Sequence, residues 1–115
     1  MQAVEFFVVK GARYSQERRH PRVPVDFPVR LQTNGFRVSD RARDVSECGV
    51  GLSTTAPLPV MSLVTVRLEV PHDGPIDLLG RVMWATKDAM GVRFEQTDAR
   101  LSDSVNRLRT GFERI

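Results

Sequence analysis

Three arginines near the start of the chain, Arg18, Arg19 and Arg22, place three guanidinium groups within five positions. A guanidinium can bind a phosphate through two parallel hydrogen bonds, and it can also stack on the flat face of an aromatic base. Pro21 and Pro24 disfavour a helix here, so we expect these side chains to project from an extended segment. The cluster therefore predicts an anionic, phosphate-bearing ligand.

A short polar turn with complementary chemistry follows about twenty residues later. Asp44 and Ser46 supply carboxylate and hydroxyl oxygens, which can accept from the N–H groups of guanine or can fix the turn itself. Gly49 allows a bend in the backbone and close approach of a ligand. Phosphate-binding groups followed by acceptors for a base edge point to a guanine nucleotide.

The two motifs together, Arg18-x-x-x-Arg22 and Asp44-x-Ser46-x-x-Gly49, resemble the paired signature of the PilZ domain, a bacterial receptor domain for cyclic di-GMP. The resemblance continues at residues 80–84 (Gly-Arg-Val-Met-Trp) and at residues 91–94 (Gly-Val-Arg-Phe), which look like the late strands of that family. It covers roughly residues 17 to 113. Order, separation and both halves of the signature match, whereas either half alone would be a weak signal.

The resemblance implies a role for each motif residue. Arg18 and Arg22 would hold the phosphates of cyclic di-GMP and stack on guanine, and Arg19 would contact phosphate or point to water. Asp44 and Ser46 would read guanine edges, and Gly49 would let the backbone approach. Binding of cyclic di-GMP would rearrange the N-terminal segment. A motility, pilus, exopolysaccharide or signalling partner would then recognise the rearranged surface.

Other residues that could take part in binding or catalysis give weaker signals. Trp84 could stack beside a guanine, but a small barrel usually needs a core aromatic, so we expect Trp84 in the core. The sequence offers no nucleophile–base pair, carboxylate dyad or Walker-type loop, so we expect a binding module and not an enzyme. We expect no metal either, because His20, His72 and Cys48 are isolated from one another.

Two alternatives belong to other classes of protein. One is a PilZ-like interaction module that acts without nucleotide, which the intact double motif argues against. The other is a small barrel that binds single-stranded nucleic acid. Such binders usually stack several bases on aromatic side chains, and Trp84 is about the only candidate here, so no nucleic-acid partner is favoured.

Composition places the protein in a broad class. Hydrophobic residues make up 41% and charged residues 27% of 115 residues, which is typical of one globular domain. Residues 10–43 hold nine basic and three acidic side chains, an asymmetry that favours an anionic partner. A single cysteine fits a reducing compartment, and the absence of a long apolar run argues against a membrane span. We therefore expect a cytoplasmic monomer or homodimer.

The spacing of apolar residues predicts a mainly β fold, a small six-stranded antiparallel barrel with a C-terminal α-helix. Expected strands cover 25–33, 36–46, 50–53, 63–70, 76–85 and 91–95, and Asn34-Gly35 predicts a hairpin. The apolar stripe of Leu101, Val105, Leu108, Phe112 and Ile115 predicts a helix over 98–114, capped by Thr97 or Asp98. We expect this helix to cover an end of the barrel rather than to form a coiled-coil seam.

We expect the chain to divide into an N-terminal extension and one domain. Residues 1–16 form an N-terminal extension with a possible short strand at Val4–Val9, and residues 17–115 form the PilZ-like domain with its C-terminal helix.

Overall fold

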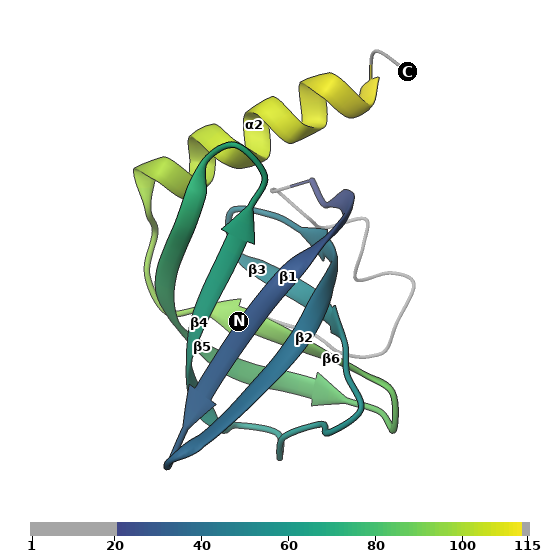
Figure 1. Ribbon diagram of the computed structural model, residues 1–115, viewed down its shortest axis with the longest axis vertical. Coiled ribbons are helices and arrows are strands. Elements are labelled where there is room, and N and C mark those ends of the chain that lie inside the picture. Colours follow the sequence, from purple (N-terminus) through teal and green to yellow (C-terminus); the bar gives the residue numbers. More distant parts are fainter. Residues whose placement is uncertain (1–20, 114–115) are drawn as a thin grey trace.

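A computed structural model describes residues 21–113 of the chain, and it shows six strands followed by one helix (Figure 1). The strands are β1 (Val23–Thr33), β2 (Phe36–Val45), β3 (Gly49–Ser53), β4 (Leu63–Val70), β5 (Gly74–Ala85) and β6 (Ala89–Phe94). They close into an antiparallel barrel in the order β1-β2-β3-β6-β5-β4. The expected fold class is confirmed, while the extension at 1–16, Arg18 and Arg19 lie outside the described residues.

Alternating apolar residues form the interior of the barrel. β4 follows the pattern without interruption, because Val64, Val66, Leu68 and Val70 are all buried while the residues between them face outward. The hairpin between β1 and β2 turns at Asn34 and Gly35, which both have positive φ (45° and 83°). Two consecutive positive φ angles match the right-handed twist of the flanking strands, which explains the Asn-Gly pair.

Two β-bulges interrupt the alternation at positions that matter for the site. In β2, Ala42 pairs with Leu52 and Asp44 pairs with Gly51, so Arg43 is an extra residue. In β5, Val82 pairs with Val92 and Trp84 pairs with Gly91, so Met83 is extra. An extra residue shifts the side chains that follow it to the other face of the sheet. Asp44 and Trp84 therefore both point to the outside of the barrel.

The C-terminal helix α2 (Ala99–Glu113) lies across one end of the barrel (Figure 1). It buries Leu101 and Val105 in the barrel core, and Leu108 packs partly against the same core. The carboxylate of Asp98 accepts a hydrogen bond from the backbone N–H of Leu101 at 3.1 Å, so Asp98 is the N-cap. The described part of the stripe therefore covers the barrel. None of the described helical residues form a span long and apolar enough to cross a membrane.

Asp73, in the turn before β5, anchors the helix to the barrel. Its carboxylate accepts hydrogen bonds from Arg107 at 2.6 Å and from the Ser104 hydroxyl at 2.8 Å. The hydrogen bond from Arg107 lowers the pKa of the Asp73 carboxyl, and the bond from Ser104 adds to this effect. Asp73 therefore stays ionised over a wide pH range, which keeps this polar contact beside the buried face of α2.

Candidate functional site

The structure brings together one residue from each half of the sequence signature. Arg22 directly precedes β1, and its Nη1 lies 2.6 Å from Oδ1 of Asp44 near the end of β2. The two side chains are 34% and 38% exposed, so each keeps surface for a ligand. Only one of the five N–H donors of the guanidinium is used in this contact, and the others can still hold a phosphate. The pair is a preformed polar corner on the outer surface.

Ser46 occupies the turn that follows Asp44, and it is only 3% exposed. Its hydroxyl oxygen accepts a hydrogen bond from the backbone N–H of Cys48 at 3.1 Å, and its own N–H donates to the carbonyl of Gly49 at 2.9 Å. These contacts give Ser46 the turn-shaping role that the sequence left open as an alternative. Its contact with a guanine edge stays a prediction.

Gly49 is required by the close packing of β3 against β6. A Cβ at this position would lie 2.5 Å from the carbonyl oxygen of Val92 in the neighbouring strand. No positive φ is found at Gly49, so the bend itself does not demand a glycine. We expected Gly49 mainly to permit a bend, and the structure gives close strand packing as the physical reason.

Cys48 lies in the same turn and is exposed. Desolvation raises the pKa of its thiol and the neighbouring Glu47 carboxylate raises it further, against the opposing effect of Arg22 and Arg93. A raised pKa keeps the thiol protonated near neutral pH, and the protonated form is the less reactive one.

Trp84 does not lie in the core, so that expectation was wrong. The bulge at Met83 turns Trp84 outward, where the side chain is 42% exposed. Its indole ring lies against Gly91 of β6 and occupies the space that a Cβ of Gly91 would need. The ring therefore presents an accessible face on the same outer surface as Asp44.

A single row of residues across neighbouring strands connects these features. Asp44 pairs with Gly51, Gly51 pairs with Gly91, and Gly91 pairs with Trp84. A Cβ at Gly51 would lie 2.9 Å from Oδ1 of Asp44, so the carboxylate leans over that glycine as the indole leans over Gly91. The carboxylate–guanidinium pair and the aromatic ring thus approach each other over two adjacent glycines, each of which makes room for one of them. A flat base with polar edges and an attached phosphate matches this arrangement.

The sequence reasoning did not select Gly51 and Gly91 as site residues. A signal was present, because a glycine inside a strand often marks close approach by another group. Only the pairing of strands, however, places the two glycines side by side. Among residues 21–113, no group of three or more metal-binding side chains is found.

Comparison with known proteins matches this chain to one protein family. The PilZ domain family model matches residues 16–110. Among solved structures, the PilZ domain of YcgR from Escherichia coli with c-di-GMP has a TM-score of 0.71 and 15% sequence identity, covering 86% of this chain and 93% of that one. No match is found among curated proteins.

Two further solved structures have the same fold. The PilZ domain of CeSA from a cellulose-synthesizing bacterium has a TM-score of 0.61 and 23% identity, covering 81% of this chain and 98% of that one. The Bacillus subtilis inhibitor of motility MotI/DgrA has a TM-score of 0.69 and 13% identity, covering 86% of this chain but 51% of that protein.

The fold and the site define a small β-barrel module closed by a C-terminal helix, with a polar site on its outer surface. The chain belongs to the PilZ domain family.

Proposed function

We propose that this protein is a cyclic di-GMP receptor and not an enzyme. The observation that carries the proposal is the pairing of Arg22 with Asp44 at 2.6 Å, across two glycines from the exposed face of Trp84. Family membership supports it, and so does the likeness to the YcgR domain, which has been solved with c-di-GMP.

Each residue has a distinct role in this proposal. Arg22 holds a phosphate with its free N–H groups and places its planar guanidinium against a base. Asp44 accepts from the guanine N–H groups, because a carboxylate has no donor and therefore favours a base edge rich in N–H. Ser46 keeps the turn in shape and completes the guanine contacts, and Trp84 stacks on a base.

Arg18 and Arg19 belong to the same proposal but lie outside the described residues. Three neighbouring guanidinium groups repel one another, and a ligand with two negative charges removes part of that repulsion. Ligand binding would thus change how the N-terminal segment lies on the barrel. A partner protein in motility, pilus, exopolysaccharide or signalling systems would recognise the new arrangement.

Calorimetry with three ligands tests the proposal. Cyclic di-GMP should bind with a Kd on the order of micromolar, about −8 kcal/mol. Cyclic GMP has one phosphate and one base, so it should bind more weakly, and a short RNA should show no comparable affinity. Equal binding of all three would indicate a non-specific anion surface. Absence of cyclic di-GMP binding would leave an interaction module that acts without nucleotide.

A further inference from the structure

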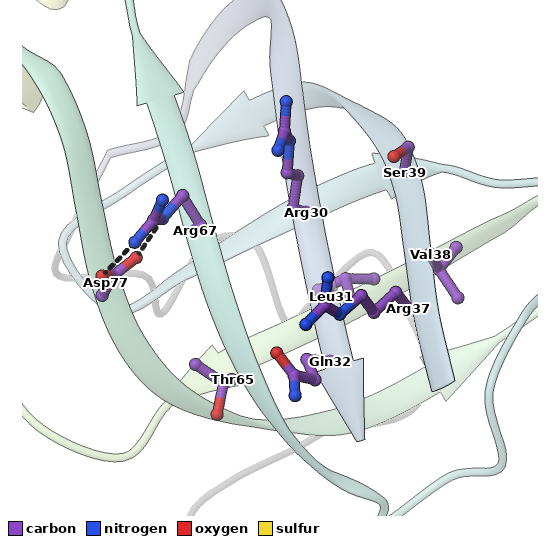
Figure 2. Close-up of a pocket in the computed structure, with 9 residues that line it drawn as sticks. All are labelled: Arg30, Leu31, Gln32, Arg37, Val38, Ser39, Thr65, Arg67 and Asp77. Atoms are coloured by element: carbon purple, nitrogen blue, oxygen red, sulfur yellow. Dashed lines mark hydrogen bonds and ion pairs between the residues drawn. The ribbon is translucent and has the colours of Figure 1, made fainter. Parts of the chain in front are cut away.

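The outer face of β4 and β5 is a second surface, distinct from the polar corner of Arg22 and Asp44. Arg67 of β4 holds Asp77 of β5 through two hydrogen bonds of 2.8 and 2.9 Å, in the lining of a groove of about 400 Å³ (Figure 2). Both side chains are exposed, so they mark the outward side of their strands, and residues two and four positions away share that side. These residues are Thr65 and Leu63 in β4, and Leu79 and Arg81 in β5.

Large apolar side chains are exposed on this face beyond the groove. Leu63 and Leu79 are 45% and 39% exposed, and they are diagonal neighbours, because Leu63 pairs with Arg81 and Leu79 stands two residues before Arg81. Met83 stands two residues after Arg81 and is 37% exposed. Leu63, Leu79 and Met83 therefore form an apolar strip around Arg81.

Arg81 does not interrupt the apolar strip with a free charge. Its Nε lies 3.3 Å from a carboxylate oxygen of Glu95, and its Nη1 donates to the backbone carbonyl of Met61 at 3.1 Å. The guanidinium is thus held by an acceptor on each side, while the methylene groups of Arg81 can pack with apolar neighbours. Met83 is followed directly by Trp84, so the apolar strip adjoins one end of the candidate site.

The chain itself contains a segment whose chemistry matches the apolar strip. Residues 4–9 (Val-Glu-Phe-Phe-Val-Val) are apolar at five of six positions, and they lie outside the described residues. We call them the N-terminal apolar segment. A run this rich in Val and Phe favours aggregation when it is left in water, so the sequence predicts that it packs on an apolar surface.

The point at which the described chain begins puts this segment within reach of the apolar strip. Arg22 pairs with Asp44, and the cross-strand row that begins at Asp44 ends at Trp84, beside Met83. This row has three strand-to-strand steps of about 4.8 Å, or about 15 Å in all. Residues 10–21 can span up to about 40 Å when extended, at about 3.3 Å per residue. The connection is therefore long enough to bring the N-terminal apolar segment onto the strip.

We propose that the N-terminal apolar segment packs on the apolar strip of its own barrel. Its two phenylalanine rings supply the largest apolar surfaces, and they cover the exposed parts of Leu63, Leu79 and Met83. The contact holds residues 10–21 beside the row from Asp44 to Trp84, because the connection must pass that row to reach the strip. It uses no atom of a ligand, so we expect it in the protein without cyclic di-GMP.

Two arguments favour the chain's own segment over a second copy of the protein. A segment tethered by a short connection is present at a local concentration on the order of millimolar, far above that of a second copy in dilute solution. A stable dimer interface also involves about 20–30 residues on each side, whereas the apolar strip has only three exposed apolar side chains. The strip therefore suits a short segment better than a second barrel.

Nuclear Overhauser effects measured on the full chain without ligand test the contact directly. Ring protons of Phe6 and Phe7 should show cross-peaks to the methyl groups of Leu63, Leu79 and Met83. A sample mixed from ¹³C-labelled and unlabelled protein separates contacts within one chain from contacts between chains. These cross-peaks should arise within one chain.

Proteolysis gives a second and independent readout. Chymotrypsin cleaves after phenylalanine, so the rate at which the N-terminal peptide is released reports how well the segment is protected. Leu63→Gln and Leu79→Gln should each raise this rate at least about 10-fold, because cleavage follows the population of the released segment. Both side chains are partly exposed, so the fold should tolerate the changes, and circular dichroism checks that it does.

Phe36→Gln is the matched control. Phe36 is 67% exposed, but it lies on the side of β2 that carries Asp40 and Ala42 and so does not belong to the outer face. This variant should leave the release rate of the N-terminal peptide within about 2-fold of the parent.

The proposal is overturned if the rings of Phe6 and Phe7 contact other residues or none. Cross-peaks that arise only between chains would overturn it as well, because a second copy would then cover the apolar strip. It is equally overturned if Leu63→Gln and Leu79→Gln release the N-terminal peptide at the parent rate. None of these outcomes depends on whether cyclic di-GMP binds.

Discussion

Asp44 and Trp84 lie on the outer face of the barrel at opposite ends of one cross-strand row, with only Gly51 and Gly91 between them. Both residues owe this position to a bulge, at Arg43 in β2 and at Met83 in β5. The two glycines leave room for these side chains, because the carboxylate covers Gly51 and the indole covers Gly91. This relationship leads to tests that separate binding from folding.

Arg22→Ala should weaken cyclic di-GMP binding by about 1.5–3 kcal/mol, the range for hydrogen bonds to charged groups. Arg22→Lys keeps the charge but loses the planar fork, so it should recover only part of the affinity. Arg41 is a matched control, because it also pairs with an aspartate at 2.6 Å, here Asp26 of the neighbouring strand β1. Calorimetry should show parent-like affinity for Arg41→Ala. An Arg22→Ala variant that binds as tightly as the parent would remove Arg22 from the site.

Asp44→Asn replaces a carboxylate with an amide of the same shape. Affinity for cyclic di-GMP should fall at least about 10-fold, because the amide places an NH₂ group where guanine also has donors. The melting temperature should change little, since a partly exposed ion pair contributes about 0–1 kcal/mol. Asp26→Asn removes the equivalent pair elsewhere and should leave affinity unchanged. Unaltered binding by Asp44→Asn would mean that Asp44 only shapes the surface.

Trp84 is the only tryptophan of the chain, so its fluorescence reports directly on the site. Saturation with cyclic di-GMP should change the emission intensity, because a stacked base alters the surroundings of the exposed indole face. Trp84→Ala should cost about 1–3 kcal/mol of binding, the range for stacking of one base, and Trp84→Phe should cost less. If neither fluorescence nor the affinity of Trp84→Ala changes, the indole merely covers Gly91.

Gly49→Ala tests packing rather than recognition. The new Cβ would press on the backbone carbonyl of Val92 at 2.5 Å, so β3 and β6 must separate slightly. We expect a loss of about 1–3 kcal/mol in the free energy of unfolding, measured by urea denaturation. Gly111→Ala is the matched control, because its Cβ would meet nothing within 4 Å and alanine favours a helix. Reduced affinity with undiminished stability would instead place Gly49 in the binding site.

Asp40 should make stability depend on pH. It points into the barrel with Oδ2 buried and without a hydrogen-bond partner among the described residues. Burial raises the pKa of its carboxyl, and a hydrogen bond from Thr54 opposes part of that increase. Because the folded-state pKa exceeds that of the unfolded chain, the contribution of Asp40 to the free energy of unfolding is fully present at pH values below the unfolded pKa. That contribution is lost as pH rises through the folded-state pKa.

Asp40→Asn carries no charge to bury, so it should lack this decline. Thermal denaturation should show the melting temperature of the variant rising relative to the parent as pH increases from about 4 to 7. A difference between Asp40→Asn and the parent that is independent of pH would mean that folding does not raise the pKa of Asp40.

Local features of the sequence were sufficient to predict most of the strands and the helix. The unbroken alternation at residues 63–70, the Asn34-Gly35 turn and the Asp98 cap each depend on residues close together in the chain, and the structure confirms all three. The two-part signature likewise led to the family, because the types and spacing of Arg22, Asp44 and their neighbours are visible in the sequence.

The tertiary structure decided which way Asp44 and Trp84 face. Alternation counted along β5 placed Trp84 inside, because that count treats every residue as paired. A bulge leaves one residue without an opposite partner, and whether it forms depends on the neighbouring strand, here β6 with the close pair of Trp84 and Gly91. For the same reason, the row of Asp44, Gly51, Gly91 and Trp84 is absent from any single stretch of sequence. It exists only because closure of the barrel brings β2, β3, β6 and β5 side by side.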